Sequence, residues 1–181
     1  GACVLLADID QAALDATTRE LGERFGADNV RGAICDVTRE DSVAAACATV
    51  AVEYGGLDIL VSNAGIASSA ALEDTSLELW NRNIGILATG YFLVTREAFR
   101  LLKRQDCGGA IAFIASKNAL VASPNAAAYC TAKAAEVQLA RAVALEGAPL
   151  GIRCNVVNPD AVLRGSKIWS GEWRRERAEA Y

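Results

Sequence analysis

The chain has 181 residues, with 18 basic and 22 acidic side chains, and it contains no histidine. This length favours one domain, residues 1–181, and a net charge of −4 argues against a general nucleic-acid binder. The lack of histidine excludes Ser-His-Asp and Cys-His catalysis and His-ligated metals, so we expect no metal site. No apolar run is long enough to cross a membrane.

Short apolar runs alternate with longer amphipathic segments along the chain. Strands are predicted at residues 3–7, 30–35, 57–61, 110–115 and 152–157. Helices are predicted at residues 11–25, 40–54, 77–103, 126–146 and 172–180. Thr38 and Asp41 resemble a capping box before the second helix, which Gly55 closes. This alternation predicts an α/β fold with a doubly wound parallel sheet.

The cysteines show no CxxC pair, which argues against a zinc ribbon or a thioredoxin-like site. We interpret them as reduced core residues of a cytoplasmic protein, although their even number also permits disulfides. They are Cys3, Cys35, Cys47, Cys107, Cys130 and Cys154. We expect no signal or transit peptide.

Polar or small residues follow every predicted strand, at the edge where ligands of such sheets bind. After the first strand, Asp8 could accept hydrogen bonds from both ribose hydroxyls of an adenosine and would repel a 2′-phosphate. Alternatively, Asp8 or Asp10 caps the following helix. After the third strand, the Asn63-Ala64-Gly65 segment would let a flat ligand approach the backbone, or it forms an ordinary turn.

Tyr129 and Lys133 are four residues apart in a predicted helix and share one face. An ammonium beside a phenol favours the phenolate, so Lys133 could lower the pKa of Tyr129. Such a tyrosine exchanges a proton with an alcohol or carbonyl oxygen, to which Ser116 could donate a hydrogen bond. The alternative is a partly buried tyrosine with a lysine that reaches toward solvent.

These motifs resemble, in register, those of the short-chain dehydrogenase/reductase family. The resemblance implies a Rossmann-like fold, NAD as cofactor, and Ser116, Tyr129 and Lys133 as catalytic residues. Its NAD-binding set would be Asp8, Asp36, Val37, Asn63, Ala64, Gly65, Tyr129, Lys133, Pro159 and Val162. In this set Asp36 and Val37 would contact the adenine, and the segment 158–162 would flank the nicotinamide.

Three departures from the family pattern stand out. The strand and glycine-rich loop that open the family's fold are absent, so the first strand and its pairing are missing from the predicted sheet. Leu87 stands where the family has its catalytic Asn, and we do not assign that role to Asn83, one helical turn away. Asp160 replaces a glycine of the nicotinamide-flanking segment.

Segments 87–93, 116–119 and above all 158–174 resemble the dehydrogenase half of bifunctional rhamnulose-1-phosphate aldolase/short-chain dehydrogenases. This likeness implies NAD-dependent oxidation of lactaldehyde in rhamnose breakdown, with an aldolase domain in the same parent chain. The absence of methionine suggests an internal fragment, although loss of the initiator from a Met-poor protein would look the same. By analogy, long helices would pair copies into a homo-oligomer.

Two other functions stay open from the sequence. Leu87, Asp160 and the missing loop would suit a non-catalytic dinucleotide-fold module that packs against a partner domain. A polyol or oxoacyl reductase of the same family is the other possibility. The run 164–169 could line the substrate pocket, whereas Arg174, Arg175 and Arg177 suit a solvated helix face.

Overall fold

The computed structural model describes residues 1–162. Its strands are β1 (Val4–Asp8), β2 (Val30–Ile34), β3 (Ile59–Ser62), β4 (Gly109–Ile114) and β5 (Ile152–Val157). Its α-helices are α1 (Gln11–Phe25), α2 (Glu40–Tyr54), α3 (Leu77–Asn83), α4 (Gly90–Gln105) and α5 (Ala127–Gly147). The short turns are η1 (Ala27–Asn29), η2 (Ile84–Thr89), η3 (Lys117–Ala119) and η4 (Ala148–Leu150). The predicted strands and the first two helices are thus confirmed, whereas the helix predicted at 172–180, the run 164–169 and the three arginines lie outside the described residues.

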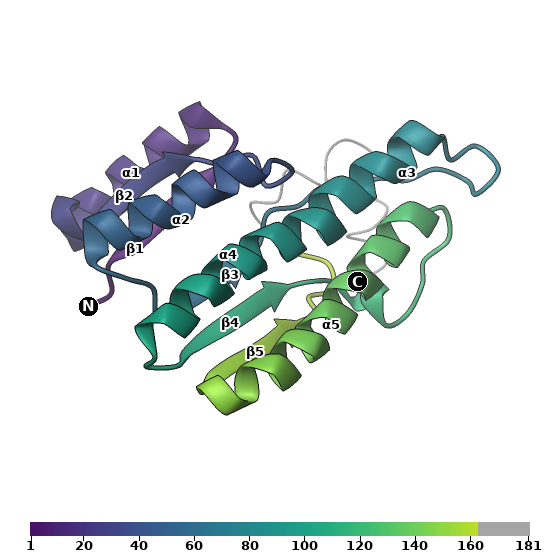
Figure 1. Cartoon of the computed structure of the whole chain (residues 1–181). Coiled ribbons are helices and arrows are strands. Elements are labelled where there is room, and N and C mark those ends of the chain that lie inside the picture. The colour runs from purple at the N-terminus through teal and green to yellow at the C-terminus, as the bar shows by residue number, and fades with distance from the viewer. Residues whose placement is uncertain (163–181) are drawn as a thin grey trace.

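The strands form two parallel sheets. β1 pairs with β2 from Val4↔Val30 to Asp8↔Ile34, and β4 pairs with both β3 and β5. Within the described residues no strand joins β1 to β3, and Figure 1 shows the first sheet set apart from the second. The facing edges of β1 and β3 are therefore the place where the expected parallel sheet is interrupted, as the resemblance predicted.

Helices lie on both faces of the first sheet. Gly32 of β2 faces α1, because a Cβ added there would lie 2.9 Å from Thr18 and 3.1 Å from Leu14. Its neighbour Arg31 points to the other face and pairs with Glu53 of α2 at 3.3 Å. Helices α2, α4 and α5 lie side by side in one layer (Figure 1). The Arg96–Glu40 ion pair, at 3.1 Å, and a small apolar cluster around Val43 and Leu93 join α4 to α2.

The main core lies between the second sheet and helices α4 and α5. Tyr91 packs edge-on against Phe113 with ring centroids 5.1 Å apart, and both side chains are buried. On β3, Leu60 packs against this core, whereas Ile59 and Val61 point to the opposite face and are 64% and 58% exposed. No described helix covers that opposite face of β3.

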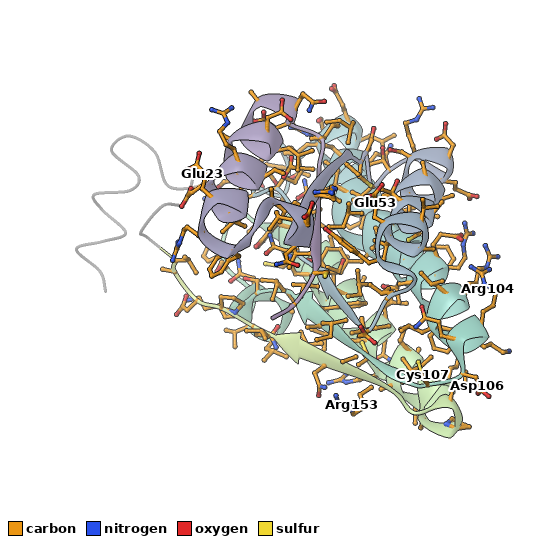
Figure 2. The ribbon with its side chains drawn as sticks, turned by 90° about the vertical axis from the view of Figure 1, so that its left-hand side faces the viewer. Glu23, Glu53, Arg104, Asp106, Cys107 and Arg153 are labelled. Carbon is orange, nitrogen blue, oxygen red and sulfur yellow. The ribbon has the colours of Figure 1, made fainter. Side chains whose placement is uncertain are left out.

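The two ends of the second sheet differ in character. Asp106, Cys107 and Arg153 lie where α4 ends and β4 and β5 begin (Figure 2). The opposite end, toward which the arrows of β4 and β5 point in Figure 1, carries the polar segments that the sequence singled out. No helix of the described chain is long and apolar enough to cross a membrane.

The predicted capping box at Thr38 is wrong. The Thr38 hydroxyl donates to the Asp36 carboxylate at 2.7 Å, and Asp41 instead binds the Arg39 guanidinium at 2.6 Å. Both side chains therefore have charge-assisted partners, and the cap position falls on Arg39 without a side-chain bond. The prediction for Gly55 is confirmed, because it ends α2 with a φ of 77°.

The long helix predicted at 77–103 is also wrong in its middle. The π-helical turn η2 separates α3 from α4, and it carries Gly85 and Leu87. Such turns are rare and often mark functional sites, but the hydrophobic pattern of a helix does not reveal them.

The interpretation of all six cysteines as core residues holds only in part. All six are free thiols, but Cys3 and Cys107 are exposed, because they precede β1 and β4 respectively rather than lying within them. Burial raises the pKa of the Cys47 and Cys154 thiols to about 11, which keeps them in the unreactive thiol form.

The open edges of β1 and β3 predict that residues 1–181, expressed alone, self-associate. We expect sedimentation velocity to show oligomers or aggregates, and we expect no tight NAD binding. Val61→Lys should raise the monomer fraction because a charged side chain blunts this surface, whereas Val52→Lys, at an 81% exposed position on α2, should not. A cooperative melt of a monomer with micromolar NAD affinity would show the prediction to be wrong.

Gly90, at the end of the π turn, and Gly85, within it, allow a controlled test of how packing there contributes to stability. A Cβ at Gly90 would lie 2.8 Å from Cγ2 of Val37, a stiff β-branched side chain, whereas one at Gly85 would meet nothing within 4 Å. We expect Gly90→Ala to lower the free energy of unfolding by about 1–3 kcal/mol. Gly85→Ala should leave it unchanged or raise it by up to about 1 kcal/mol. Urea denaturation measures both, and equal midpoints would contradict the packing described.

Candidate active site

Three predicted catalytic residues meet at the carboxyl end of β4. Ser116 follows the strand by two residues and is the N-cap of η3, where its hydroxyl accepts from the Asn118 amide at 3.2 Å. Tyr129 and Lys133 stand on the first turns of α5, which packs against η3. The strand end thus fixes the serine, and helical spacing fixes the other two on one face.

The Ser116 hydroxyl acts on the Tyr129 phenol and opposes the rise of its pKa, and Lys133 Nζ lies 5.9 Å from the centroid of the Tyr129 ring. The hydroxyl group of the serine and the ammonium of the lysine therefore both approach the phenol. This is the arrangement that proton exchange with a substrate oxygen requires, because the phenol needs a hydrogen-bond partner and a nearby positive charge.

The Lys133 side chain is buried and has several fixed partners. Its ammonium donates to the Ile114 carbonyl at 3.1 Å, at the end of β4, and lies 5.3 Å from the Tyr91 ring centroid. The Tyr91 hydroxyl donates to the same carbonyl at 2.8 Å. One helical turn along α5, Glu136 is fully buried and its two carboxylate oxygens lie 3.0 and 3.1 Å from Lys133 Nζ.

The expected lowering of the Tyr129 pKa is not found. Burial is the largest effect and raises the pKa of Tyr129, a rise that the hydrogen bond with Ser116 opposes and the charge of Glu136 reinforces. Burial also lowers the pKa of Lys133 and raises that of Glu136 to about 7. The pKa of Tyr129 therefore rises because the phenol is buried and because Glu136 adds a negative charge nearby, and the motif alone reveals neither effect.

The acidic residues of the first sheet lie at the same edge. Asp10 caps α1 by accepting from the Ala13 amide at 3.0 Å, and Asp8 accepts from the Asp10 amide at 2.8 Å. The capping role therefore belongs to Asp10, and Asp8 is exposed at the end of β1. Next to it along the edge, hydrogen bonds from the Thr38 hydroxyl and amide lower the pKa of Asp36, so this carboxylate is ionised and fixed.

The segment after β3 runs past the lysine. Asn63, Ala64 and Gly65 are exposed, and a Cβ at Gly65 would lie 3.3 Å from Leu87 and 4.0 Å from Lys133 Nζ. Leu87, fully buried in the π turn, thus stands beside the lysine and supplies no polar group there. Asn83 is buried too, but it bonds the Leu79 carbonyl and accepts from Ser68, a structural use that agrees with our not assigning it a catalytic role.

The unusual Asp160 has a clear structural role. Its carboxylate lies 2.6 Å from Lys117 Nζ, and the Lys117 amide donates to the Pro159 carbonyl at 2.9 Å. These contacts join the segment after β5 to η3, directly beside Ser116. Val162, at the end of the described chain, is 55% exposed.

Sequence reasoning missed three contributors to the lysine's environment: Glu136, Tyr91 and the Ile114 carbonyl. A signal existed for Glu136, because an acid three residues after Lys133 on an alanine-rich helix shares the lysine's face. No such signal existed for Tyr91, which comes from α4, or for a backbone carbonyl.

The residues present suit part of a dinucleotide. An exposed acid at the end of β1, a glycine whose Cβ would crowd Leu87 and the lysine, and the Ser116–Tyr129 pair lie along one sheet edge, where such ligands bind. Among residues 1–162 no glycine-rich turn leads from a strand into a helix, so the described chain offers no cradle of that kind for the pyrophosphate. No group of three or more Cys, Asp or Glu within the same residues could hold a metal ion.

Comparison with known proteins agrees with this geometry. A sequence model of the family described as enoyl-(acyl carrier protein) reductase matches residues 1–175. The uncharacterized oxidoreductase YuxG of Bacillus subtilis (strain 168) is 46% identical over all 181 residues, and the chain spans only 26% of that relative's length.

Solved structures share the fold over most of the chain. Sorbitol-6-phosphate 2-dehydrogenase SrlD from Erwinia amylovora matches with a TM-score of 0.89 and 30% identity, over 93% of this chain and 66% of the other. A short-chain type dehydrogenase/reductase from Mycobacterium marinum gives 0.84 and 37%, over 88% and 62%. The 3-ketoacyl-(acyl-carrier-protein) reductase from Brucella melitensis complexed with NADH gives 0.83 and 32%, over 89% and 66%. The chain therefore belongs to the short-chain dehydrogenase/reductase family of oxidoreductases.

Proposed function

We propose that the chain carries the catalytic residues of an NAD-dependent dehydrogenase that oxidises a small alcohol or hydrated aldehyde such as lactaldehyde. This proposal is supported by the meeting of Ser116, Tyr129 and Lys133 at the end of β4, where the ammonium lies 5.3 Å from the Tyr91 ring centroid and 5.9 Å from that of Tyr129. The alternative from the sequence was a partly buried tyrosine with a lysine that reaches toward solvent. Lys133 does not fit it, because the side chain is buried and its ammonium donates to the Ile114 carbonyl.

Each residue has one task in this proposal. Ser116 donates a hydrogen bond that orients the substrate oxygen, and Tyr129 takes the proton from the substrate hydroxyl. Lys133 holds its positive charge beside the phenol, and its remaining donor is free to reach a ribose hydroxyl once Ile114 and Glu136 have taken the others. The nicotinamide, when bound, accepts the hydride.

The preference for NAD rests on Asp8. An exposed carboxylate at the end of β1 accepts hydrogen bonds from ribose hydroxyls and repels a 2′-phosphate. Asp36 and Val37 would contact the adenine, Asn63, Ala64 and Gly65 would run beneath the cofactor, and Pro159 and Val162 would flank the nicotinamide.

The choice of lactaldehyde and the wider setting are the finer part of the proposal. They rest on the resemblance to bifunctional rhamnulose-1-phosphate aldolase/short-chain dehydrogenases and on a relative, YuxG, about four times as long as this chain. In this setting the parent protein is cytoplasmic, carries an aldolase domain before residues 1–181, forms a homo-oligomer, and acts in rhamnose breakdown without nucleic-acid or membrane partners.

A second candidate is a polyol or oxoacyl reductase, which the names of two structural neighbours favour. A panel of lactaldehyde, sugar alcohols and oxoacyl thioesters, assayed with the parent protein, separates the substrates. The non-catalytic module is tested by titrating the parent protein with NAD, because a pure packing domain would not bind it.

Replacing the Tyr129 hydroxyl should remove the proton acceptor. We expect Tyr129→Phe in the parent protein to lower kcat for NADH formation by about 10²–10⁴-fold while NAD binding is retained. Tyr54→Phe, on α2 and away from the site, is the matched control and should leave turnover unchanged. Undiminished turnover by Tyr129→Phe would refute the assigned role.

Removing the charge at the end of β1 should change cofactor choice. We expect Asp8→Ser to weaken NAD binding and to narrow the preference for NAD over NADP by about tenfold, because the 2′-phosphate loses a repelling carboxylate. Asp10→Ser serves as the control, because the serine hydroxyl can take over the capping of α1 from the carboxylate. Titration of both variants with NAD and NADP measures the ratio of the two affinities. An unchanged ratio in Asp8→Ser would show that the adenosine ribose does not bind beside Asp8.

A further inference from the structure

The carboxylate of Glu136, which the proposed mechanism does not use, lies in contact with Lys133. Glu136 is 0% exposed, and its only ion-pair partner among the described residues is Lys133. Lys133 donates to Oε2 at 3.1 Å, whereas Oε1, although 3.0 Å from the ammonium, has no hydrogen bond in the described chain. A fully buried carboxylate compensated by a single ammonium is costly to ionise, and burial raises its pKa, so this group is placed to take up a proton.

The surroundings of Glu136 explain why its protonation would matter. The titratable groups that face it are Lys133 and Tyr129 from α5 and Tyr91 from α4, and β4 contributes the Ile114 carbonyl to the same cluster. Tyr91 does not compete for the proton, because burial raises the pKa of its phenol well above the ordinary value. Its hydroxyl is already committed to the Ile114 carbonyl.

The other side of the lysine is apolar. Leu87 is fully buried and lies with Lys133 around Gly65. A leucine side chain cannot bind a proton or donate a hydrogen bond, so the polar partners of the ammonium within the described chain are Glu136, at 3.0 and 3.1 Å, and the Ile114 carbonyl, at 3.1 Å.

We propose that Glu136 is a positioning residue that acts through Lys133: its carboxylate fixes the ammonium beside Tyr129, and by binding or releasing one proton it changes the net charge of the pair from zero to +1. This proposal rests on the proposed function only for the role of Tyr129. The proton comes from solvent and returns to it, and no other bond is made or broken.

The direction of the effect follows from charge. When Glu136 is protonated, the pair carries +1 and stabilises the phenolate, which lowers the pKa of Tyr129. When Glu136 is ionised, the pair is neutral and the pKa of Tyr129 is higher. Since burial raises the pKa of Glu136 to about 7, the change falls in the physiological range. The two groups therefore titrate as a coupled system.

The test measures the Tyr129 phenol directly in the parent protein, by NMR of 13Cζ-labelled tyrosine, with the signal assigned by its loss in Tyr129→Phe. Glu136→Gln replaces the carboxylate with a neutral amide of the same shape, so the pair carries +1 wherever Lys133 is protonated. We expect it to lower the pKa of Tyr129 by about one unit, a tenfold change in the acid dissociation constant. Glu146→Gln, an exposed position on the same helix, should leave it unchanged.

A second measurement needs no substitution at Glu136. In the unmodified parent protein the Tyr129 signal should show a step near neutral pH, where Glu136 titrates, before the phenol itself ionises. A Tyr129 pKa that is the same in Glu136→Gln and wild type would overturn the proposal, and so would a single-step titration of the unmodified protein. A purely structural Glu136 would change the melting temperature and leave the Tyr129 titration where it was.

The outcome is distinguishable from failure of the proposed function. The titration requires no turnover, so it reads the charge coupling even if the substrate is unknown. If Tyr129→Phe retained activity while Glu136→Gln still shifted the phenol, the proposed function would fail and the coupling would stand. If Tyr129→Phe lost activity while Glu136→Gln did not shift the pKa of Tyr129, the proposed dehydrogenase function would stand and the role of Glu136 would be refuted.

Discussion

A buried ammonium ion is the constraint around which this site is organised. An ion of this size loses several kcal/mol of hydration when it is buried, so Lys133 is stable in its position only because other groups replace the lost water. The carbonyl of Ile114 and the carboxylate of Glu136 do so directly, and the rings of Tyr91 and Tyr129 surround the charge. The partners that hold the lysine belong to β4, α4 and α5, so the packing of these elements and the chemistry of the site depend on each other.

The same packing explains why the site lies at one end of the second sheet. β4 is the central strand and pairs with β3 and β5, so its end is fixed on both sides. Phe113 and Ile111 of β4 pack on α4 and α5, which brings the first turns of α5 over the strand end. The Lys117–Asp160 ion pair then joins the segment after β5 to the residue next to Ser116. The first sheet brings its acids to the same edge through the contact between α2 and α4.

Most of the fold and part of the site could be predicted from the sequence. The strands were predictable because parallel, buried strands are continuous apolar runs, and the helices because they are amphipathic. The Ser116–Tyr129–Lys133 group was predictable because Tyr129 and Lys133 are four residues apart on one helix and Ser116 directly follows a predicted strand. The π turn was not, because a single extra residue in a turn leaves hydrophobic periodicity nearly intact. The effect of Glu136 on the phenol was missed because the sign of a pKa shift depends on burial and on every neighbouring charge, neither of which a motif contains.

We propose that the nicotinamide end of the cofactor docks against the face of α5 that bears Tyr129 and Lys133. The most direct measurement is a crystal structure of the parent protein with NADH. We expect Lys133 Nζ to keep its bonds to the Ile114 carbonyl and Glu136 and to direct its remaining donor to a ribose hydroxyl, with the nicotinamide facing the Tyr129 hydroxyl. A cofactor bound away from this face, or a lysine turned from Ile114 toward solvent, would contradict it.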